Sequence, residues 1–282
     1  MRRIRSAGLD PVTDFERIAR EFGQYDFPWD LEQALSFALF RTYAVPSIGR
    51  LLYDTRQFTD DVQKRHDDTA LLLGEIVDEG LESTQGRAAV RRMNQMHGRY
   101  DISNDDMRYV LSTFVVMPNR WVNRYGWRRT TPAEDQAGVA YYRRLGQLMG
   151  IRDLPEDLAG FERLLDEYEA EHFAFDVKSR AVADSTLALL VSFYPRPLAP
   201  LVRRFSVALM DPPVREAFGY AHPPRWFEAA AHGGLRLRGK VVRWMPERTA
   251  PRRVRDSRRI RSYPGGFLIE RLGTFGEPLP RP

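Results

Sequence analysis

Cysteine is absent from this chain of 282 residues. Its absence excludes disulfides, cysteine-ligated zinc, iron–sulfur clusters and a haem bound through a thiolate. No run of about 18 apolar residues occurs either, so the sequence predicts no transmembrane helix. Arg2, Arg3 and Arg5 are not followed by an apolar stretch, and we therefore expect no signal peptide. Together these absences favour a protein of the reducing cytoplasm.

The motifs of several large enzyme classes are also missing. The chain has no HExxH, GxSxG, Walker or GxGxxG sequence, which leaves zinc proteases, serine hydrolases, P-loop nucleotide hydrolases and Rossmann dehydrogenases without support. A carboxylate-bridged di-iron centre needs two helices with a Glu-x-x-His sequence, and the chain does not contain two. The candidate imidazole ligands are five histidines: His66, His97, His172, His222 and His232.

Apolar residues recur at helical spacing along most of the chain, and strand-like alternation is scarce. The spacing predicts helices over residues 62–80 and 84–98, each closed by a glycine. A helix that begins with the capping sequence at residues 103–106 is expected to stop at Pro118. One long helix is expected from residue 159 to residue 192. The pattern therefore predicts an all-α fold, around which an extended N-terminal segment wraps.

The C-terminal part of the chain differs in composition. Residues 236–262 carry eleven arginines and lysines against two acidic residues. We therefore expect one helical domain over residues 1–245 and a basic C-terminal arm over residues 246–282 that docks on it. Residues 246–262 could touch an anionic membrane, whereas nucleic-acid binding is not expected because no recognised binding module accompanies the charges. A solvated tail in an arginine-rich protein is the alternative.

One histidine, His97, lies at the end of an apolar helical face and among arginines. A neutral imidazole can bind iron through one ring nitrogen, and Met93, one turn earlier, could pack on a porphyrin. Arg91, Arg92 and Arg99 offer guanidinium groups for the two propionates of haem. A hydrogen-bonded structural histidine is the other interpretation, and the residues alone leave both open.

Several segments together resemble a family of haem oxygenases that includes the bacterial rubber oxygenases and the fungal oxygenases of mycophenolic acid biosynthesis. The likeness is greatest to the fungal branch and follows the chain in order. It implies a globin-reminiscent helical fold, haem b, O₂ as co-substrate and oxidative cleavage of an isoprenoid double bond. It also implies that His97 is the iron ligand. The matching segments are residues 90–97, 102–106, 109–114, 121–127, 168–172, 215–220 and 263–267.

The resemblance also indicates residues on the opposite side of the haem. Rubber oxygenases carry an Arg-x-x-Lys-Thr element, and the matching residues here include Arg65 and Thr69 but have Asp68 in the lysine position. Arg65 could stabilise negative charge on bound oxygen, Thr69 could donate a hydrogen bond, and Asp68 could act as a base. An Arg65–Asp68 ion pair and a Thr69 bond within the helix are the structural alternatives. Because the lysine is missing, this chain could instead be a member of the family with altered redox chemistry.

His172 lies on an apolar face with Tyr168 and Phe175, where it could line a substrate pocket or bond a propionate. A core histidine paired with Glu169 or Glu171 is the alternative. The leading hypothesis is a haem b-dependent oxygenase for a hydrophobic, isoprenoid or lipid-like substrate. A non-catalytic helical protein whose basic arm binds a membrane or nucleic acid is the competing one. The sequence does not indicate an oligomeric state.

Overall fold

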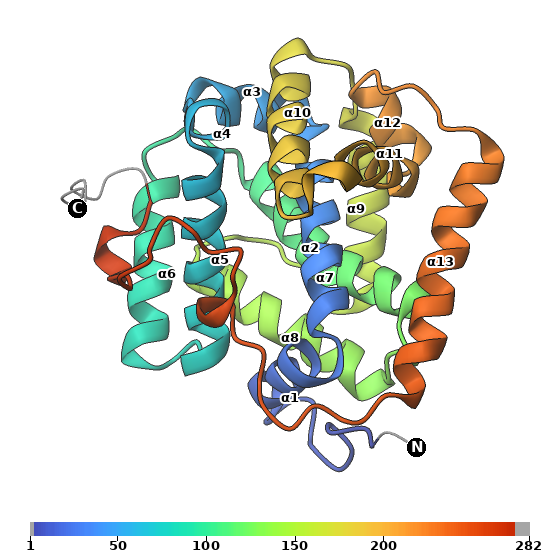
Figure 1. The fold of residues 1–282 in the computed structure, drawn as a ribbon. Coiled ribbons are helices and arrows are strands. Elements are labelled where there is room, and N and C mark those ends of the chain that lie inside the picture. The colour runs from blue at the N-terminus through green and yellow to red at the C-terminus, as the bar shows by residue number, and fades with distance from the viewer. Residues whose placement is uncertain (1–2, 274–282) are drawn as a thin grey trace.

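The computed structural model describes residues 3–273, and no β-strand occurs among them (Figure 1). This confirms the all-α prediction; the likeness to globins and the division at residue 245 stay predictions. A π-helical turn (Phe22–Asp26) and short 3₁₀ turns (Arg196–Leu198, Val254–Asp256, Ile269–Arg271) join the helices. The helices are α1 (Phe15–Glu21), α2 (Pro28–Tyr43), α3 (Pro46–Asp54), α4 (Gln57–Asp60), α5 (Val62–Glu79), α6 (Thr84–His97), α7 (Asn104–Tyr125), α8 (Pro132–Leu148), α9 (Leu158–His172), α10 (Val177–Ser192), α11 (Ala199–Leu209), α12 (Pro212–Ala217) and α13 (Arg225–Trp244).

The N-terminal part is helical, so the expectation of an extended segment there was wrong. Helix α2 passes through the centre of the molecule along α7 (Figure 1). Pro28 occupies its first turn, where the missing N–H is tolerated. Buried residues then follow on nearly every side of α2, including Ala34, Phe37 and Phe40. A helix that is buried all round lacks the apolar stripe by which amphipathic helices are detected.

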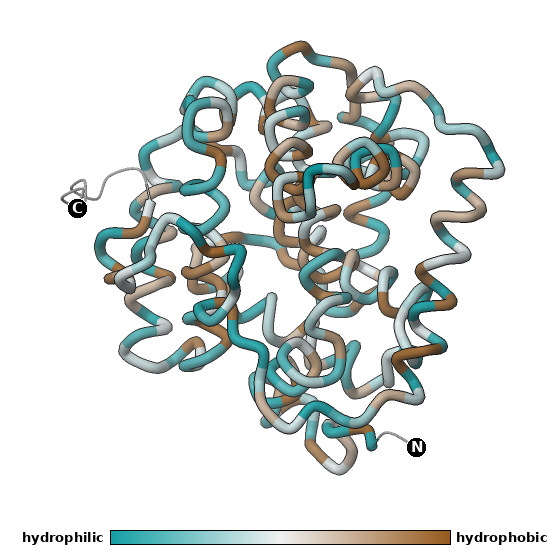
Figure 2. The backbone as a smooth tube through the Cα atoms, in the orientation of Figure 1, coloured by the Kyte–Doolittle hydropathy of each residue, from teal (hydrophilic) through white to brown (hydrophobic). Residues whose placement is uncertain are grey.

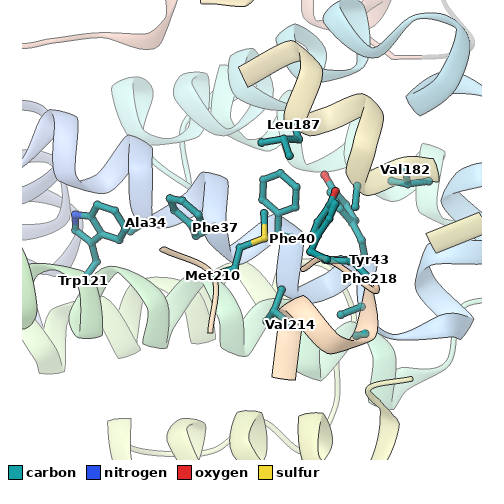
Figure 3. Close-up of a cluster of buried hydrophobic side chains, with 14 of the residues drawn as sticks. Ala34, Phe37, Phe40, Tyr43, Trp121, Val182, Leu187, Met210, Val214 and Phe218 are labelled. Atoms are coloured by element: carbon teal, nitrogen blue, oxygen red, sulfur yellow. The ribbon is translucent and has the colours of Figure 1, made fainter. Parts of the chain in front are cut away.

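The main apolar core surrounds α2 (Figure 3). Phe40 and Tyr43 point from α2 toward α10 and α12, and the ring of Trp121 from α7 stacks on Phe37 with centroids 5.5 Å apart. Aromatic side chains dominate this cluster, and each buries a large apolar area. Because α2, α7, α10 and α12 all contribute to it, the core fixes the relative positions of elements distant in the sequence.

Two predicted helix ends differ from the structure. The single helix expected over residues 159–192 is divided into α9 and α10, because Asp176 begins α10 by accepting the N–H groups of Lys178 and Ser179. Helix α7 does not stop at Pro118 and continues to Tyr125. Val115 and Val116 before Pro118 and Trp121 and Val122 after it are buried, and their packing offsets the hydrogen bond that the proline removes.

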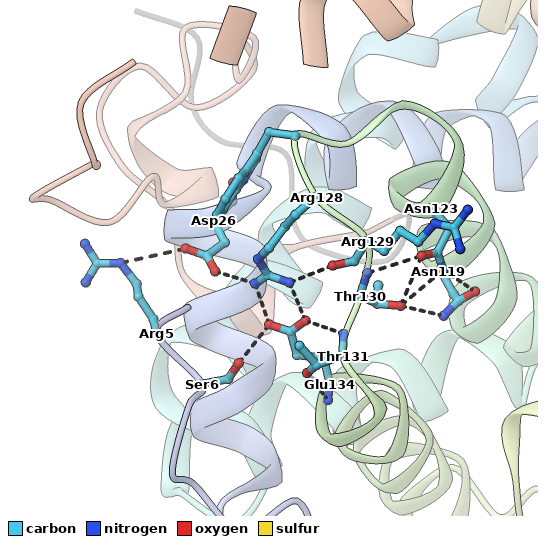
Figure 4. Close-up of polar contacts among 11 residues, drawn as sticks. Arg5, Ser6, Asp26, Asn119, Asn123, Arg128, Arg129, Thr130, Thr131 and Glu134 are labelled. Carbon is cyan, nitrogen blue, oxygen red and sulfur yellow. Dashed lines mark hydrogen bonds and ion pairs between the residues drawn. The ribbon is translucent and has the colours of Figure 1, made fainter. Parts of the chain in front are cut away.

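The start of α8 follows the sequence prediction. Thr131 and Glu134 form a reciprocal capping box, with bonds of 3.2 and 2.9 Å between backbone and side chains. The Glu134 carboxylate also accepts hydrogen bonds from the guanidinium of Arg128 and the hydroxyl of Ser6. Arg128 donates as well to the carboxylate of Asp26, in the turn that follows α1 (Figure 4). This buried network ties the N-terminal segment to the connection between α7 and α8.

Helices α5 and α6 form an antiparallel pair at one side of the molecule, and the C-terminal segment runs along them (Figure 1). Apolar residues of both helices face each other, while hydrophilic residues occupy much of the connecting and outer backbone (Figure 2). Residues 246–273 contain two short 3₁₀ turns and otherwise irregular backbone, as predicted for this stretch. Within the described part of the chain, no helix is long and apolar enough to cross a membrane.

Candidate functional site

The antiparallel pairing of α5 and α6 brings Arg65, near the start of α5, close to His97, at the end of α6. Ser83 begins α6 by accepting the N–H of Gly86 at 2.9 Å. A short turn joins the two helices, so the first turns of α5 lie beside the last turn of α6. Two residues that the sequence analysis selected thus lie near each other.

His97 is a neutral imidazole without a hydrogen-bond partner. Burial and, to a smaller extent, the positive charge of Arg65 together lower the pKa of His97 to about 4. Its Nδ1 atom is buried, and neither ring nitrogen forms a hydrogen bond to any residue between 3 and 273. A buried polar atom left unpaired costs about 1–3 kcal/mol, so it indicates a site that a ligand completes.

Arg65 is a deeply enclosed cation. It donates to the hydroxyl of Thr69, whose own hydroxyl donates to the backbone carbonyl of Arg65 at 3.0 Å. The guanidinium lies 5.1 Å from the ring centre of Phe58 in α4. Within residues 3–273 no carboxylate lies at ion-pair distance from it, and burial lowers the pKa of Arg65. An enclosed guanidinium without a carboxylate favours a ligand that carries negative charge.

The expected helical ion pair between Arg65 and Asp68 was wrong, whereas the Thr69 bond within the helix is confirmed. Asp68 instead pairs with Lys64 at 2.7 Å and accepts the hydroxyl of Tyr263. The side chain of Asp68 is buried between α5 and the C-terminal segment. It therefore anchors that segment in the structure.

Two further hydroxyl groups had no signal in the sequence. The buried hydroxyl of Tyr43 on α2, which lies near Arg65, faces the buried hydroxyl of Thr186 on α10, and neither bonds to any other group within residues 3–273. Burial raises the pKa of Tyr43 to about 12 although the charge of Arg65 opposes the shift. Tyr43 therefore stays protonated at neutral pH and can donate. Its position on α2 beside the apolar residues Phe37 and Phe40 makes it look like an ordinary core residue in the sequence.

A small apolar cavity lies between α1, α7 and α8. It has a volume of about 90 Å³ and is lined by Tyr142, with Phe114 and Pro118 among its apolar residues, and neither Arg65 nor His97 lines it. Apolar surroundings of this kind accept a hydrophobic ligand.

The other predicted cofactor residues lie in different surroundings. Met93 is buried in the apolar cluster of α5 and α6. Arg92 donates to the carbonyl of Leu272 at 2.6 Å, and Arg91 and Arg99 are exposed. His172 stacks on Tyr168, and its Nδ1 atom lies 3.0 Å from the Tyr168 carbonyl. The structure shows His172 with this partner instead of Glu169 or Glu171, and within residues 3–273 no hydrogen bond or ring contact joins it to His97.

No three His, Asp or Glu side chains converge as a metal site within residues 3–273. A lone imidazole holds iron in proteins when a macrocycle supplies the remaining ligands. An open hollow of about 580 Å³ lies between α5 and the C-terminal segment, lined by Leu71, Arg255 and Phe267 among others, and it does not include His97. The single imidazole donor at His97 does not fit an iron bound by protein side chains alone.

Comparison with known proteins gives one consistent result. Residues 31–244 match the family described as ER-bound oxygenase mpaB/B'/rubber oxygenase, catalytic domain. The ER-bound oxygenase mpaB' of Penicillium brevicompactum is 33% identical over 260 residues, 85% of this chain and 62% of that protein. The ER-bound oxygenase mpaB of Penicillium roqueforti (strain FM164) is 32% identical over 229 residues, 74% of this chain and 77% of that protein.

A second Penicillium brevicompactum protein, ER-bound oxygenase mpaB, is 34% identical over 201 residues, 64% of this chain and 51% of that protein. The chain thus spans between half and two thirds of the two Penicillium brevicompactum proteins. The family match covers most of the chain and confirms the resemblance seen in its segments. The chain belongs to the family of the ER-bound oxygenases mpaB and mpaB' and rubber oxygenase.

Proposed function

We propose that this chain is a haem b-dependent oxygenase that uses O₂ to oxidise a hydrophobic substrate with a carbon–carbon double bond. The observation that supports it most is the unpartnered imidazole of His97 beside the enclosed guanidinium of Arg65. A protein that used both residues only for stability would pair them, because each costs free energy as it stands. Family membership supports oxygenase chemistry independently.

His97 would hold the cofactor through a ring nitrogen. With its pKa at about 4, the imidazole keeps a free lone pair at neutral pH, which iron binding requires. Arg91 is exposed and has no ion pair within the described residues, so it is available for a propionate. To bind a propionate, Arg92 would have to break its hydrogen bond to the carbonyl of Leu272. Arg99 and His172 stay candidates for propionate binding. When bound, haem would supply the redox centre for a reaction with O₂.

The residues of the chain then have definable tasks. Arg65 stabilises negative charge that develops on oxygen, because its guanidinium has no competing carboxylate within the described residues. Thr69 fixes the guanidinium through the hydroxyl contact within α5. Tyr43 supplies a second hydroxyl donor that stays protonated. Asp68 is engaged by Lys64 and Tyr263, so a role as base would require release from both.

The class of substrate rests on two supports. The family description includes a rubber oxygenase, which indicates an olefinic hydrocarbon for that member. In this chain, the 90 Å³ cavity beside Tyr142 has mainly apolar walls, with Phe114, Val115 and Leu158 among them. These apolar walls support a hydrophobic class of substrate, although the cavity as it stands is smaller than an isoprenoid chain and neither His97 nor Arg65 lines it.

Haem titration of the purified chain tests the proposal. The wild type should develop a Soret absorption band with one equivalent of haem, and His97→Ala should lose it while the matched surface variant His222→Ala keeps it. Arg65→Gln should retain the band but lower O₂ uptake with an olefinic lipid by about 10²–10³-fold, the usual effect of removing one charge-stabilising donor. A colourless wild type, or a His97→Ala variant with an unchanged spectrum, would contradict it.

A further inference from the structure

Helix α13 carries large apolar side chains on its outer face. Trp226 is 67% exposed, Leu237 62%, Val241 55% and Trp244 88%. With about 3.6 residues per turn, these four positions lie along one side of the helix. Helix α13 forms the edge of the molecule (Figure 1). Leu237, Val241 and Trp244 lie on successive turns, whereas Trp226 lies about three turns earlier, beyond the small exposed residues Ala230 and Gly233; the four large side chains are here called the α13 ridge.

The ridge is not needed to hold α13 in place. The opposite face of the helix is buried through Ala231 and Leu235. Gly239 lies so close to the chain of α7 that an added Cβ would sit 2.8 Å from the carbonyl oxygen of Gly126. A helix with a packed inner face and a second apolar face outside exposes area that folding does not use.

Cations line one edge of the α13 ridge. Arg225, Arg236, Lys240 and Arg243 are all exposed, and none has a carboxylate at ion-pair distance within residues 3–273. At 3.6 residues per turn all four fall on the same flank of the ridge. The helix contains one acidic residue, Glu228, and Arg215 pairs with it on the inner side. The outer face is thus apolar and positive, without negative charge.

The arginines of the C-terminal segment are differently placed. Arg252 pairs with Glu32 at 3.0 Å, and Arg255 lies within 3.2 Å of carboxylates on α5. Arg259 also pairs with Glu32. These cations are neutralised within the molecule. The exposed Arg248, Arg253 and Arg258 of the same segment have no carboxylate at ion-pair distance within residues 3–273. The segment differs from α13 in that none of its large apolar side chains between residues 246 and 262 is exposed.

We propose that the α13 ridge docks on the surface of an anionic phospholipid bilayer. Trp226 and Trp244 enter the interface between headgroups and acyl chains, where tryptophan is favoured, together with Leu237. Lys240 and its neighbouring arginines bind lipid phosphates. A second copy of the chain is disfavoured as the occupant, because its own row of cations would face this one across a symmetric contact. The proposal does not depend on haem or on oxygenase activity.

Vesicle co-sedimentation of the full chain tests this surface. The chain should bind vesicles of mixed phosphatidylcholine and phosphatidylserine, bind pure phosphatidylcholine vesicles much less, and dissociate as salt is raised. Lys240→Gln should weaken binding roughly fivefold, which corresponds to about 1 kcal/mol for one cation near the membrane. Trp244→Ser should weaken it at least as much. The matched exposed controls, Arg163→Gln and Phe175→Ser, should leave binding unchanged.

Trp fluorescence gives a second readout that does not depend on sedimentation. Addition of anionic vesicles should shift the emission of the wild type to the blue, and Trp244→Ser should reduce the shift. Three results would overturn the proposal. They are no vesicle binding by a folded wild type, binding that Lys240→Gln and Trp244→Ser leave intact, and self-association that Trp244→Ser abolishes in the absence of vesicle binding.

Discussion

Replacing Asp67 by asparagine is expected to release the C-terminal segment from α5. The Asp67 carboxylate is fully buried, and one of its oxygens accepts the backbone N–H groups of Arg261 and Ser262, each at 2.9 Å. The other oxygen accepts Gln63 at 2.8 Å and lies 3.0 Å from Nδ1 of His66. The side-chain amide of asparagine has a single acceptor oxygen. In either orientation of that amide, two of the donors that Asp67 now accepts would face its NH₂ group.

The magnitude follows from the number of donors that lose their acceptor. Two donors on one side of Asp67 are left unsatisfied, and each costs about 1–3 kcal/mol when buried. We expect a loss of about 3 kcal/mol in the free energy of local opening, which is roughly a hundredfold in the opening equilibrium. Trypsin cleavage at Arg259 and Arg261 under native conditions, or hydrogen exchange of residues 257–263, measures this opening directly.

Glu32→Gln is the matched control. Glu32 binds the same segment through Arg252 and Arg259, but these ion pairs lie near the surface and are worth about 1 kcal/mol or less. The opening equilibrium of Glu32→Gln should therefore change less than tenfold. If Asp67→Asn opens no faster than Glu32→Gln, the backbone bonds to Asp67 do not hold the segment and the reasoning fails.

The same carboxylate predicts how the segment responds to pH. Burial opposes ionisation of Asp67, but hydrogen bonds from His66 and the backbone of Ser262 and Arg261 outweigh it, so the pKa of Asp67 is lowered. Its contribution to stability is present above the ordinary carboxyl pKa and is lost as pH falls through the lowered one. Hydrogen exchange of the segment, corrected for intrinsic rates, should stay constant near neutrality and rise below about pH 4. Release near pH 6 would contradict this.

Two further predictions concern packing and buried charge. Gly239→Ala should cost about 1–3 kcal/mol in urea denaturation because its methyl group meets the carbonyl oxygen of Tyr125, whereas Gly233→Ala, which faces open space on the same helix, should gain up to about 1 kcal/mol. Equal effects would contradict the close approach. Arg41→Met should lower the free energy of unfolding by about 3–5 kcal/mol because it leaves Glu169 buried without its cation. Arg41→Met combined with Glu169→Met should recover part of that loss. If the effects of the two substitutions on the free energy of unfolding simply add, the ion pair does not contribute as argued.

The sequence predicted the amphipathic helices α5 and α6 and missed the central helix α2. The expected helices over residues 62–80 and 84–98 agree with α5 and α6 to within one or two residues, because each has one apolar face and a terminal signal. Helix α2 has no such period, since the core surrounds it. The break at Asp176 depends on a side chain cap that competes with a continuous helical pattern.

The candidate site was predictable in part. Resemblance indicated Arg65 and His97, and the antiparallel pair explains why the two lie together. The buried hydroxyls of Tyr43, near Arg65, and of Thr186, which faces Tyr43, could not be foreseen, because α2 and α10 are far from α5 in the sequence. The partner of Asp68 was equally hidden, since Tyr263 lies 195 residues further along the chain. The spacing of residues in the sequence predicts which side chains are neighbours within one helix, but it does not predict contacts between distant segments.

Asp68→Lys is the substitution that separates the two interpretations of this position. If Asp68 anchors the C-terminal segment, a lysine there places a second ammonium beside Lys64 and leaves the hydroxyl of Tyr263 without its acceptor. A buried charge without a partner costs about 3–5 kcal/mol, so the variant should unfold at lower urea concentration than Asp68→Asn, which loses the charge but keeps an acceptor. A haem-loaded Asp68→Lys variant with wild-type stability and a shifted Soret band would instead show that the lysine reaches the cofactor. Because α5 presents Arg65 and Thr69 to the interior and Asp67 and Asp68 to the segment, we expect the loss of stability.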